Sequence, residues 1–197
     1  MKKSLIVAGL LLAGSSLLAD DANKLFVGIG ANIGIGEQTA SVAGISATAD
    51  GDYDSIPITF GYITSGEDRF KISYQKINAD YSSDGETYKE EYTGFDFDYD
   101  WTIQSWKSNK ILPYVGVGVG FYNYEQTAQY LVGDDDLNGV SLNLNAGILY
   151  QPVDNVDIEL GYKFKHINWQ DIRLLSGYTL ELEDDISSIY IGLNYKF

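Results

Sequence analysis

Apolar and polar residues alternate along much of the chain, and the alternation begins at Leu25. From Leu25 to Gly36 every second residue is apolar, and the residues between are mainly glycine. A period of two is the signature of a β-strand, whose successive side chains point to opposite faces. Seven later stretches have the same pattern: Ile56–Ile63, Phe70–Gln75, Phe95–Gln104, Tyr114–Tyr122, Val140–Tyr150, Val156–Lys165 and Ser188–Phe197. No stretch after residue 19 has helical periodicity over a useful length, so we predict an all-β fold of eight strands.

The links between these stretches alternate in length. Short, turn-like links lie at Ser65–Asp68, Ser105–Asn109 and Pro152–Asn155. Long polar links lie at Glu37–Ser55, Asn78–Glu91, Gln126–Asn138 and Ile167–Asp185. An even number of strands joined in this way is typical of an eight-stranded antiparallel transmembrane β-barrel. Such a barrel has short periplasmic turns, four longer extracellular loops and both termini on the periplasmic side.

The composition of the two strand faces decides between a soluble barrel and a membrane barrel. In a soluble barrel the polar face meets water, where glycine weakens a strand for no gain. The polar face here is rich in glycine, for example Gly28, Gly116 and Gly118, which fits the narrow interior of an eight-stranded barrel. The apolar face carries aromatic residues near strand ends, as interfacial girdles do. These are Phe60, Tyr62, Phe70, Trp101, Phe121, Tyr150, Tyr162, Phe164, Tyr195 and Phe197. We therefore predict lipid outside the barrel and polar packing inside.

The N-terminus has the three parts of a secretory signal peptide. Lys2 and Lys3 are followed by an apolar run from Leu5 to Leu18 and by the small residue Ala19. A transmembrane anchor is disfavoured, because the run is shorter than the roughly 20 apolar residues that a spanning helix needs. We predict a cleaved signal peptide over residues 1–19 and an outer-membrane β-barrel domain over residues 20–197.

Charge and cysteine content exclude several classes of function. The net charge is −15, and removal of residues 1–19 takes away two lysines and no acid, which gives −17. Such an acidic surface argues against binding to nucleic acid, whose phosphates would be repelled. The chain has no cysteine, so disulfides, thiolate metal sites and a cysteine nucleophile are excluded.

Three motifs resemble those of known outer-membrane proteins. Tyr190-x-Gly192-x-x-Tyr195-x-Phe197 resembles the C-terminal assembly signal of such proteins, in which a glycine precedes spaced aromatic residues. Pro113–Phe121 resembles the mid-barrel motif of OmpA-like and opacity-type surface proteins, and the stretch from Gln151 to Lys163 resembles the turn and strand that follow there.

The resemblance covers residues 24–197 and implies a porin-family barrel domain without a periplasmic domain. It implies the outer membrane of a Gram-negative bacterium as the location. Outer-membrane lipids, lipopolysaccharide and the barrel-assembly machinery are the implied partners, and the last would read Phe197. We expect a monomer without cofactor or metal that is not an enzyme and serves envelope structure, surface contact or adhesion through its loops. The alternatives are a narrow porin-like channel and a lipid A-modifying enzyme. No surface or host ligand can be named from the sequence.

Charged residues with inward parity are the candidate functional site. Like charges on one strand repel one another unless cations lie between them, so we predict a lumen charge network. It comprises Asp96, Asp98 and Asp100 with Lys71, Lys163, Lys165 and Glu159, and Asp157 lies on the same face as Glu159. Two functions fit this pattern, an ion-selective path or gate and a structural salt-bridge plug, and we favour the plug. The prediction is a closed or barely conducting lumen.

His166 and the acidic links are the remaining candidates. A hydrolase or acyltransferase site would need a serine or an acid beside His166, and only Asp171 and Ser176 lie in the adjoining link. We expect a non-catalytic histidine. The acidic runs at 50–54, 134–136 and 181–185 lack EF-hand spacing, so we expect solvated loops rather than sites that bridge cations to lipopolysaccharide phosphates.

Overall fold

The computed structural model describes residues 24–83, 86–125, 136–174 and 177–197, so the predicted signal peptide lies outside the described residues. The described chain is almost entirely strand, apart from the short 3₁₀ helix η2 (Gln104–Trp106). The strands are β1 (Lys24–Val42), β2 (Ile45–Ser55), β3 (Ile58–Ile63), β4 (Arg69–Ser83), β5 (Glu86–Thr102), β6 (Ile111–Glu125), β7 (Asp136–Val153), β8 (Val156–Trp169), β9 (Ile172–Arg173) and β10 (Thr179–Lys196).

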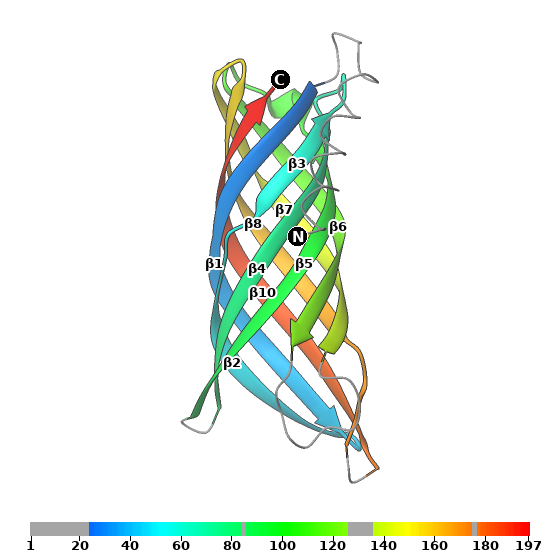
Figure 1. Cartoon of the computed structure of the whole chain (residues 1–197). Coiled ribbons are helices and arrows are strands. Elements are labelled where there is room, and N and C mark those ends of the chain that lie inside the picture. Colours follow the sequence, from blue (N-terminus) through cyan, green and yellow to red (C-terminus); the bar gives the residue numbers. More distant parts are fainter. Residues whose placement is uncertain (1–23, 84–85, 126–135, 175–176) are drawn as a thin grey trace, which may run out of the picture.

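Each strand pairs antiparallel with its neighbour, and β1 pairs with β10 to close the sheet into a barrel (Figure 1). β2 and β3 act as one wall strand, because they pair with successive parts of the same neighbour. The first part of β1, up to the pair Ile29–Ile58, pairs with β3, and the rest, from the pair Asn32–Ser55 onward, pairs with β2. In the part of the chain that the structure describes, the closed ring therefore has eight wall strands, with β9 as a short addition to β10. The predicted eight-stranded antiparallel barrel is confirmed.

The interruption between β2 and β3 lies at Ile56 and Pro57. Proline has no backbone N–H to donate to a ladder. The Pro57 carbonyl still accepts a hydrogen bond from the Gly30 N–H at 3.0 Å, so the wall stays in register across the break.

The two ends of the barrel differ. The start of β1 and the end of β10 lie together at what we call the termini end, at the top of Figure 1. At the far end β1 and β2 are joined by a two-residue turn at Ala43 and Gly44, both with positive φ (52° and 81°), as a type I′ hairpin turn requires.

The expectation of long loops at the far end is wrong over most of the described part. Two of the four predicted links, Glu37–Ser55 and Ile167–Asp185, consist mainly of strand. So does Asn78–Glu91, apart from residues 84–85, which lie outside the description; residues 126–135 of the fourth link lie outside it too. Most polar residues of these links face outward, and the inner face of the same strands is mainly apolar, so these strands lack the apolar outer face that marks the others.

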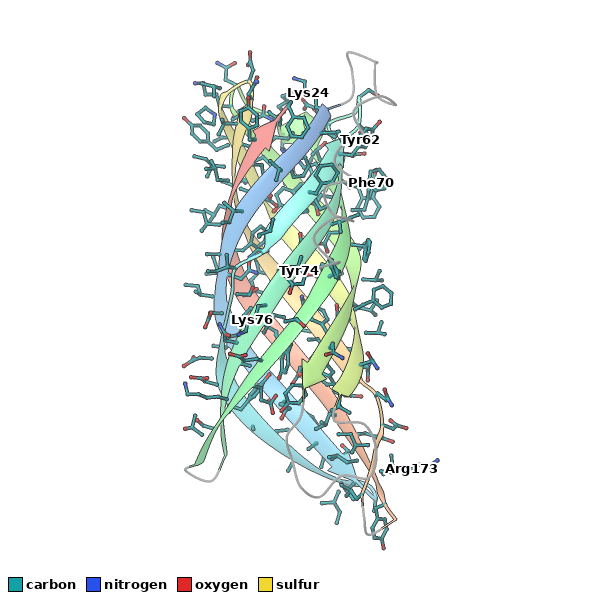
Figure 2. All side chains as sticks on the ribbon, in the orientation of Figure 1. Lys24, Tyr62, Phe70, Tyr74, Lys76 and Arg173 are labelled. Atoms are coloured by element: carbon teal, nitrogen blue, oxygen red, sulfur yellow. The ribbon has the colours of Figure 1, made fainter. Side chains whose placement is uncertain are left out.

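Strand β4 shows this exchange of faces. Phe70, Ile72 and Tyr74 are exposed on the outside, and beyond Tyr74 the outward positions become polar from Lys76 onward (Figure 2). On the inside, polar residues give way to Ile77, Ala79 and Tyr81, which are buried. The outer surface therefore has an apolar band from the termini end to about the level of Tyr74, and a polar collar beyond it.

The apolar band consists of outward side chains of the wall strands, and these side chains are exposed at the surface of the barrel. Ile33 of β1 is 67% exposed and Leu142 of β7 is 62% exposed. A continuous apolar surface of this kind needs an apolar solvent, which a lipid bilayer provides. Among the described residues, none of the helices has the length and apolar character needed to cross a membrane.

Candidate functional site: the filled lumen

The lumen opens at the termini end into a vestibule of about 350 Å³. Its lining includes Glu67, Arg69, Leu112 and Lys196. Arg69, Leu112 and Lys196 are buried side chains, so the vestibule ends against a packed layer rather than an open channel.

The first layer of buried charge lies directly inside this vestibule. Asp157 of β8 is paired with Arg69 of β4 and, at 2.7 Å, with Lys196 of β10. Lys71 lies between Asp100 of β5, at 2.6 Å, and Glu159 of β8, at 3.0 Å. Because each charge has a partner of opposite sign, the layer is held without bulk water.

Glu159 is the centre of the hydrogen bonds in this first layer. The hydroxyls of Tyr114 and Tyr190 donate to Glu159 Oε1 at 2.8 and 3.0 Å. Asn194 donates to Glu159 Oε2 at 3.1 Å. Three strands, β4, β6 and β10, thus converge on this one carboxylate of β8.

The second layer of charge lies nearer the far end. Lys163 of β8 pairs with Asp98 at 2.9 Å, and Lys165 pairs with Asp96 at 2.9 Å. Asp96 also accepts hydrogen bonds from Tyr122 at 2.6 Å and from Gln75 at 2.8 Å. These contacts join β4, β5, β6 and β8 across the lumen.

Within the described residues, the two layers contain five carboxylates and five cations that are joined by ion pairs. They are Asp96, Asp98, Asp100, Asp157 and Glu159 with Arg69, Lys71, Lys163, Lys165 and Lys196. The structure thus brings together every residue of the predicted lumen network. Sequence reasoning missed Arg69 and Lys196, although both have inward parity and so carried the same signal as the lysines it named.

A small cavity remains between the layers. It has a volume of about 40 Å³ and is lined by Lys71, Glu159, Lys163 and Asn194, among others. This volume holds only a few water molecules. The cavity therefore has room for solvation inside the lumen but is too small to be a path through it.

An aromatic and aliphatic cluster fills the lumen at the far end, beyond the apolar band. Its buried members include Tyr81 of β4, Tyr92 of β5 and Trp169 of β8, contributed from different sides of the ring. The Tyr92 and Trp169 rings lie 4.9 Å apart. The cluster continues with Tyr53, Ile77, Ala79, Tyr122, Leu137, Ile167, Ile172, Leu182 and Ile186.

Asp184 is buried within this far-end cluster, whereas the sequence places it among solvated loop acids; that expectation is wrong. Its side chain is 0% exposed. The indole N–H of Trp169 donates to Asp184 Oδ2 at 2.5 Å, and the Tyr81 hydroxyl donates to Oδ1 at 3.1 Å. Burial raises the pKa of Asp184 to about 6, because a low-dielectric site disfavours the charged form.

His166 lies on the outside of β8. Its Nδ1 is 2.7 Å from Asp185 Oδ1, and its Nε2 is 3.0 Å from Asn168 Nδ2. The side-chain partners of His166 among the described residues are thus a carboxylate and an amide, and neither carries the hydroxyl that a serine hydrolase site requires. Ser176 lies outside the described residues.

The residues of the C-terminal motif have different environments. Tyr190 is buried and bonded to Glu159, and Gly192 pairs with Gly30 of β1. Tyr195 and Phe197 are exposed on the outside, with ring centroids 6.4 Å apart. The Phe197 N–H donates to the Leu25 carbonyl at 3.0 Å.

No protein-family model matches the chain, and no curated protein matches its sequence. Two solved structures are similar in fold. One is Neisserial surface protein A (NspA), at 15% identity and a TM-score of 0.53, over 88% of this chain and 97% of that one. The other is the outer membrane protein OprG from Pseudomonas aeruginosa, at 12% identity and a TM-score of 0.57, over 89% of this chain and 95% of that one. At these identities the similarity concerns the fold alone. The chain has the fold of the outer-membrane β-barrel proteins.

Proposed function

We propose that this protein is an integral barrel of a bacterial outer membrane, that its far end faces out of the cell, and that it acts through that surface. Envelope structure and surface contact are the roles that fit, rather than transport or catalysis. The single observation that carries the proposal is the filled lumen. Two layers of paired charge and the far-end cluster lie one after another along the barrel axis.

The membrane part of the proposal is supported by the outer surface. The apolar band faces outward on strands all around the ring, and a ring closed by β1 and β10 leaves no unpaired strand edge in hydrocarbon. Within the apolar band, such a closed wall has no backbone edge to share with a neighbour, which supports a monomer in the membrane. Outer-membrane lipids contact the band, and lipopolysaccharide surrounds the polar collar.

The closed lumen is supported by the cost of opening it. An ion crossing the barrel would have to separate Lys71 from Glu159 or Lys165 from Asp96, and each separation breaks a buried ion pair. It would then have to displace the aromatic rings around Trp169.

A narrow channel is the second candidate, and the vestibule and the small lumen cavity are the observations that favour it. Single-channel recording in planar bilayers distinguishes the two. We expect no stable conductance from the purified, folded barrel. Folding is verified in the same sample by the shift of the unheated band on electrophoresis. Stable conductance steps from folded protein would overturn the closed-lumen proposal in favour of the channel.

A matched variant makes this test sharper. Trp169→Ala and Tyr92→Ala together remove two rings of the far-end cluster, whereas Trp101→Ala removes a ring from the outer surface. Both layers of paired charge remain in the first variant. Conductance of the first variant alone would therefore assign the closure to the cluster, and silence of both variants would assign it to the charge layers.

The third candidate, a lipid A-modifying enzyme, depends on His166. The contacts of its ring with Asp185 and Asn168 do not assemble a nucleophile and base. Mass spectrometry of lipid A from cells that express the wild type or His166→Ala is the test. We expect identical lipid A species, and a species lost only in the variant would restore the enzyme hypothesis.

A further inference from the structure

Strands β1, β2 and β10 continue beyond the rest of the wall at the far end. β1 pairs with β10 as far as Val42–Leu180, and with β2 as far as Val42–Ile45. The pairing of β4 with β2 ends at the pair Asp50–Ser82. Residues Ile45–Ala49 of β2 therefore have β1 on one side and, in the described part of the chain, no strand on the other (Figure 1, blue and cyan at the foot of the view).

The backbone groups on this free edge can be assigned from the hairpin. In a two-residue hairpin the residues that flank the turn, here Val42 and Ile45, exchange backbone hydrogen bonds, and the next pair along does not. The N–H and C=O groups of Ser46 and Thr48 therefore point away from β1. The Ser41 and Ser46 hydroxyls lie 2.8 Å apart, as the closer side chains of a non-hydrogen-bonded pair do.

This edge has none of the usual protection. Natural sheets protect free edges with charged side chains, proline or bulges. The segment from Gln38 to Ala49 contains no charged residue and no proline, in a chain of which 21% is charged. Ser46 and Thr48 are exposed, and Ile45 is 78% exposed. The opposite edge of the extension differs, because β9 pairs there with Thr179 and Leu180 of β10.

The surface beside the free edge is strongly acidic. A groove of about 730 Å³ begins at Asp50, directly after the edge, and runs across the outside of β4, β2, β1 and β10. Its carboxylates are Glu37, Asp50, Asp52, Asp80 and Asp185. Lys89 forms an ion pair with Asp80 at 2.8 Å. The groove thus retains an excess of negative charge.

We propose that an extended, cationic segment of a partner protein adds to β2 as a further strand at Ile45–Ala49. The added strand runs antiparallel to β2. It lies on the same side of β2 as β4, beyond the point where β4 ends at Ser83. It exchanges backbone hydrogen bonds with Ser46 and Thr48, and its cationic side chains face the acidic groove. The inference rests on the proposed function, because the edge must face out of the cell to meet a partner.

The side-chain preference of the segment follows from the two faces of β2. Ile45, Ala47 and Ala49 lie on the inward face, and Ala49 packs against the far-end cluster. An added strand should therefore alternate apolar residues, over Ala47, with cationic residues on the outward face. Pairing with a second copy of this chain is disfavoured, since it would bring two acidic grooves together.

Peptide binding to the purified barrel in detergent micelles tests the inference. The probe is a fluorescent hexapeptide of alternating lysine and valine, followed by fluorescence anisotropy. The comparison peptides are the same sequence with one central valine replaced by proline, and an alternating glutamate–valine peptide. We expect binding of the lysine–valine peptide, and weaker binding of both others by about tenfold or more.

Variants of Thr48 locate the site. Thr48→Pro removes an N–H that points to the free edge and not to β1, and should weaken binding about tenfold, whereas Thr48→Ala should leave it within about twofold. Thr48→Lys gives a second variant that protects the edge with charge if the proline impairs folding. Equal binding by the proline-containing peptide, or unchanged binding by folded Thr48→Pro and Thr48→Lys, would overturn strand addition.

Two further outcomes also decide the matter. Equal binding of the glutamate–valine peptide would refute the cationic preference, and a dimer lost on Thr48→Lys would assign the edge to a second copy. The proposed function is tested by two other measurements. Conductance of the barrel, or inaccessibility of the Ala43–Gly44 turn to an external protease, would contradict it. Peptide binding by the purified barrel is independent of both readouts.

Discussion

Gly118 of β6 lies directly opposite Asp98 of β5, and a Cβ atom at Gly118 would overlap the Asp98 carboxylate. The relation repeats along both strands, at Gly116–Asp100 and Gly120–Asp96. The glycines of the Val-Gly repeat thus provide the space for the carboxylates of the Asp-x-Asp-x-Asp repeat on the next strand. The valines between them face outward in the apolar band.

We therefore expect Gly118→Ala to destabilise the barrel by about 1–3 kcal/mol, because the methyl group forces a buried carboxylate out of its ion pair. Urea unfolding in phospholipid vesicles measures the change. Gly192→Ala is the matched control, since the nearest heavy atom to a Cβ there is Glu159 Cβ at 3.6 Å. It should alter the free energy of unfolding by no more than about 0.5 kcal/mol. Equal losses for the two variants would contradict this explanation.

Replacement of Lys165 by methionine should destabilise the barrel by about 1–3 kcal/mol, because it removes the 2.9 Å pair and leaves buried Asp96 with only the longer pair to Lys163, at 3.3 Å. The same urea titration measures it. Lys76→Met is the control, because the Lys76–Glu91 pair at 2.7 Å lies at the exposed surface, where such pairs contribute about 0–1 kcal/mol. The double variant Lys165→Met with Asp96→Asn should lose less than the two single variants add up to, and strict additivity would argue against a direct pair.

Asp184 should make the far end less stable at neutral than at acidic pH. Its folded pKa of about 6 lies above the unfolded value of about 3.9, so the folded state holds the proton more tightly. Its stabilising contribution is complete below the unfolded pKa and is lost as pH rises through about 6. Hydrogen exchange of backbone amides at the far ends of β8 and β10, corrected for intrinsic rates, should show more frequent opening at about pH 7 than at about pH 5.

Asp184→Asn should remove this pH dependence, because the amide stays neutral throughout. Glu183→Gln, a change at the exposed neighbour on the same strand, should leave it in place. Persistence of the full dependence in Asp184→Asn would show that another group is responsible.

Phe197 is expected to matter more for assembly than for the finished barrel. Its side chain is 58% exposed, and its recorded backbone contact is the N–H bond to Leu25, which a substitution to serine retains. Phe197→Ser should therefore fold into vesicles as the wild type does, but accumulate less in the outer membrane of expressing cells. The amount of heat-modifiable protein in isolated envelopes measures this. Phe70→Ser, an exposed aromatic at the same end outside the motif, serves as the control (Figure 2).

The sequence by itself determined the number of wall strands, the side of each strand that faces lipid and the charged residues that face inward. The physical reason is that alternation is local: once a segment is extended, every second side chain lies on the same face whatever the neighbouring strands do. The inward direction of Asp96, Asp98 and Lys165 follows from this parity alone.

Only the tertiary structure decided which of those charges meet. Arg69 pairs with Asp157, which is 88 residues away along the chain, because the stagger of eight strands and the closure of β1 on β10 bring them to one level of the lumen. It also decided that polar segments such as 78–83 are strands. Their apolar face turns inward where the bilayer ends and water takes its place, and Asp184 is buried against that face. The tertiary structure also decided that, among the described residues, no strand pairs with the outer edge of β2 at Ile45–Ala49.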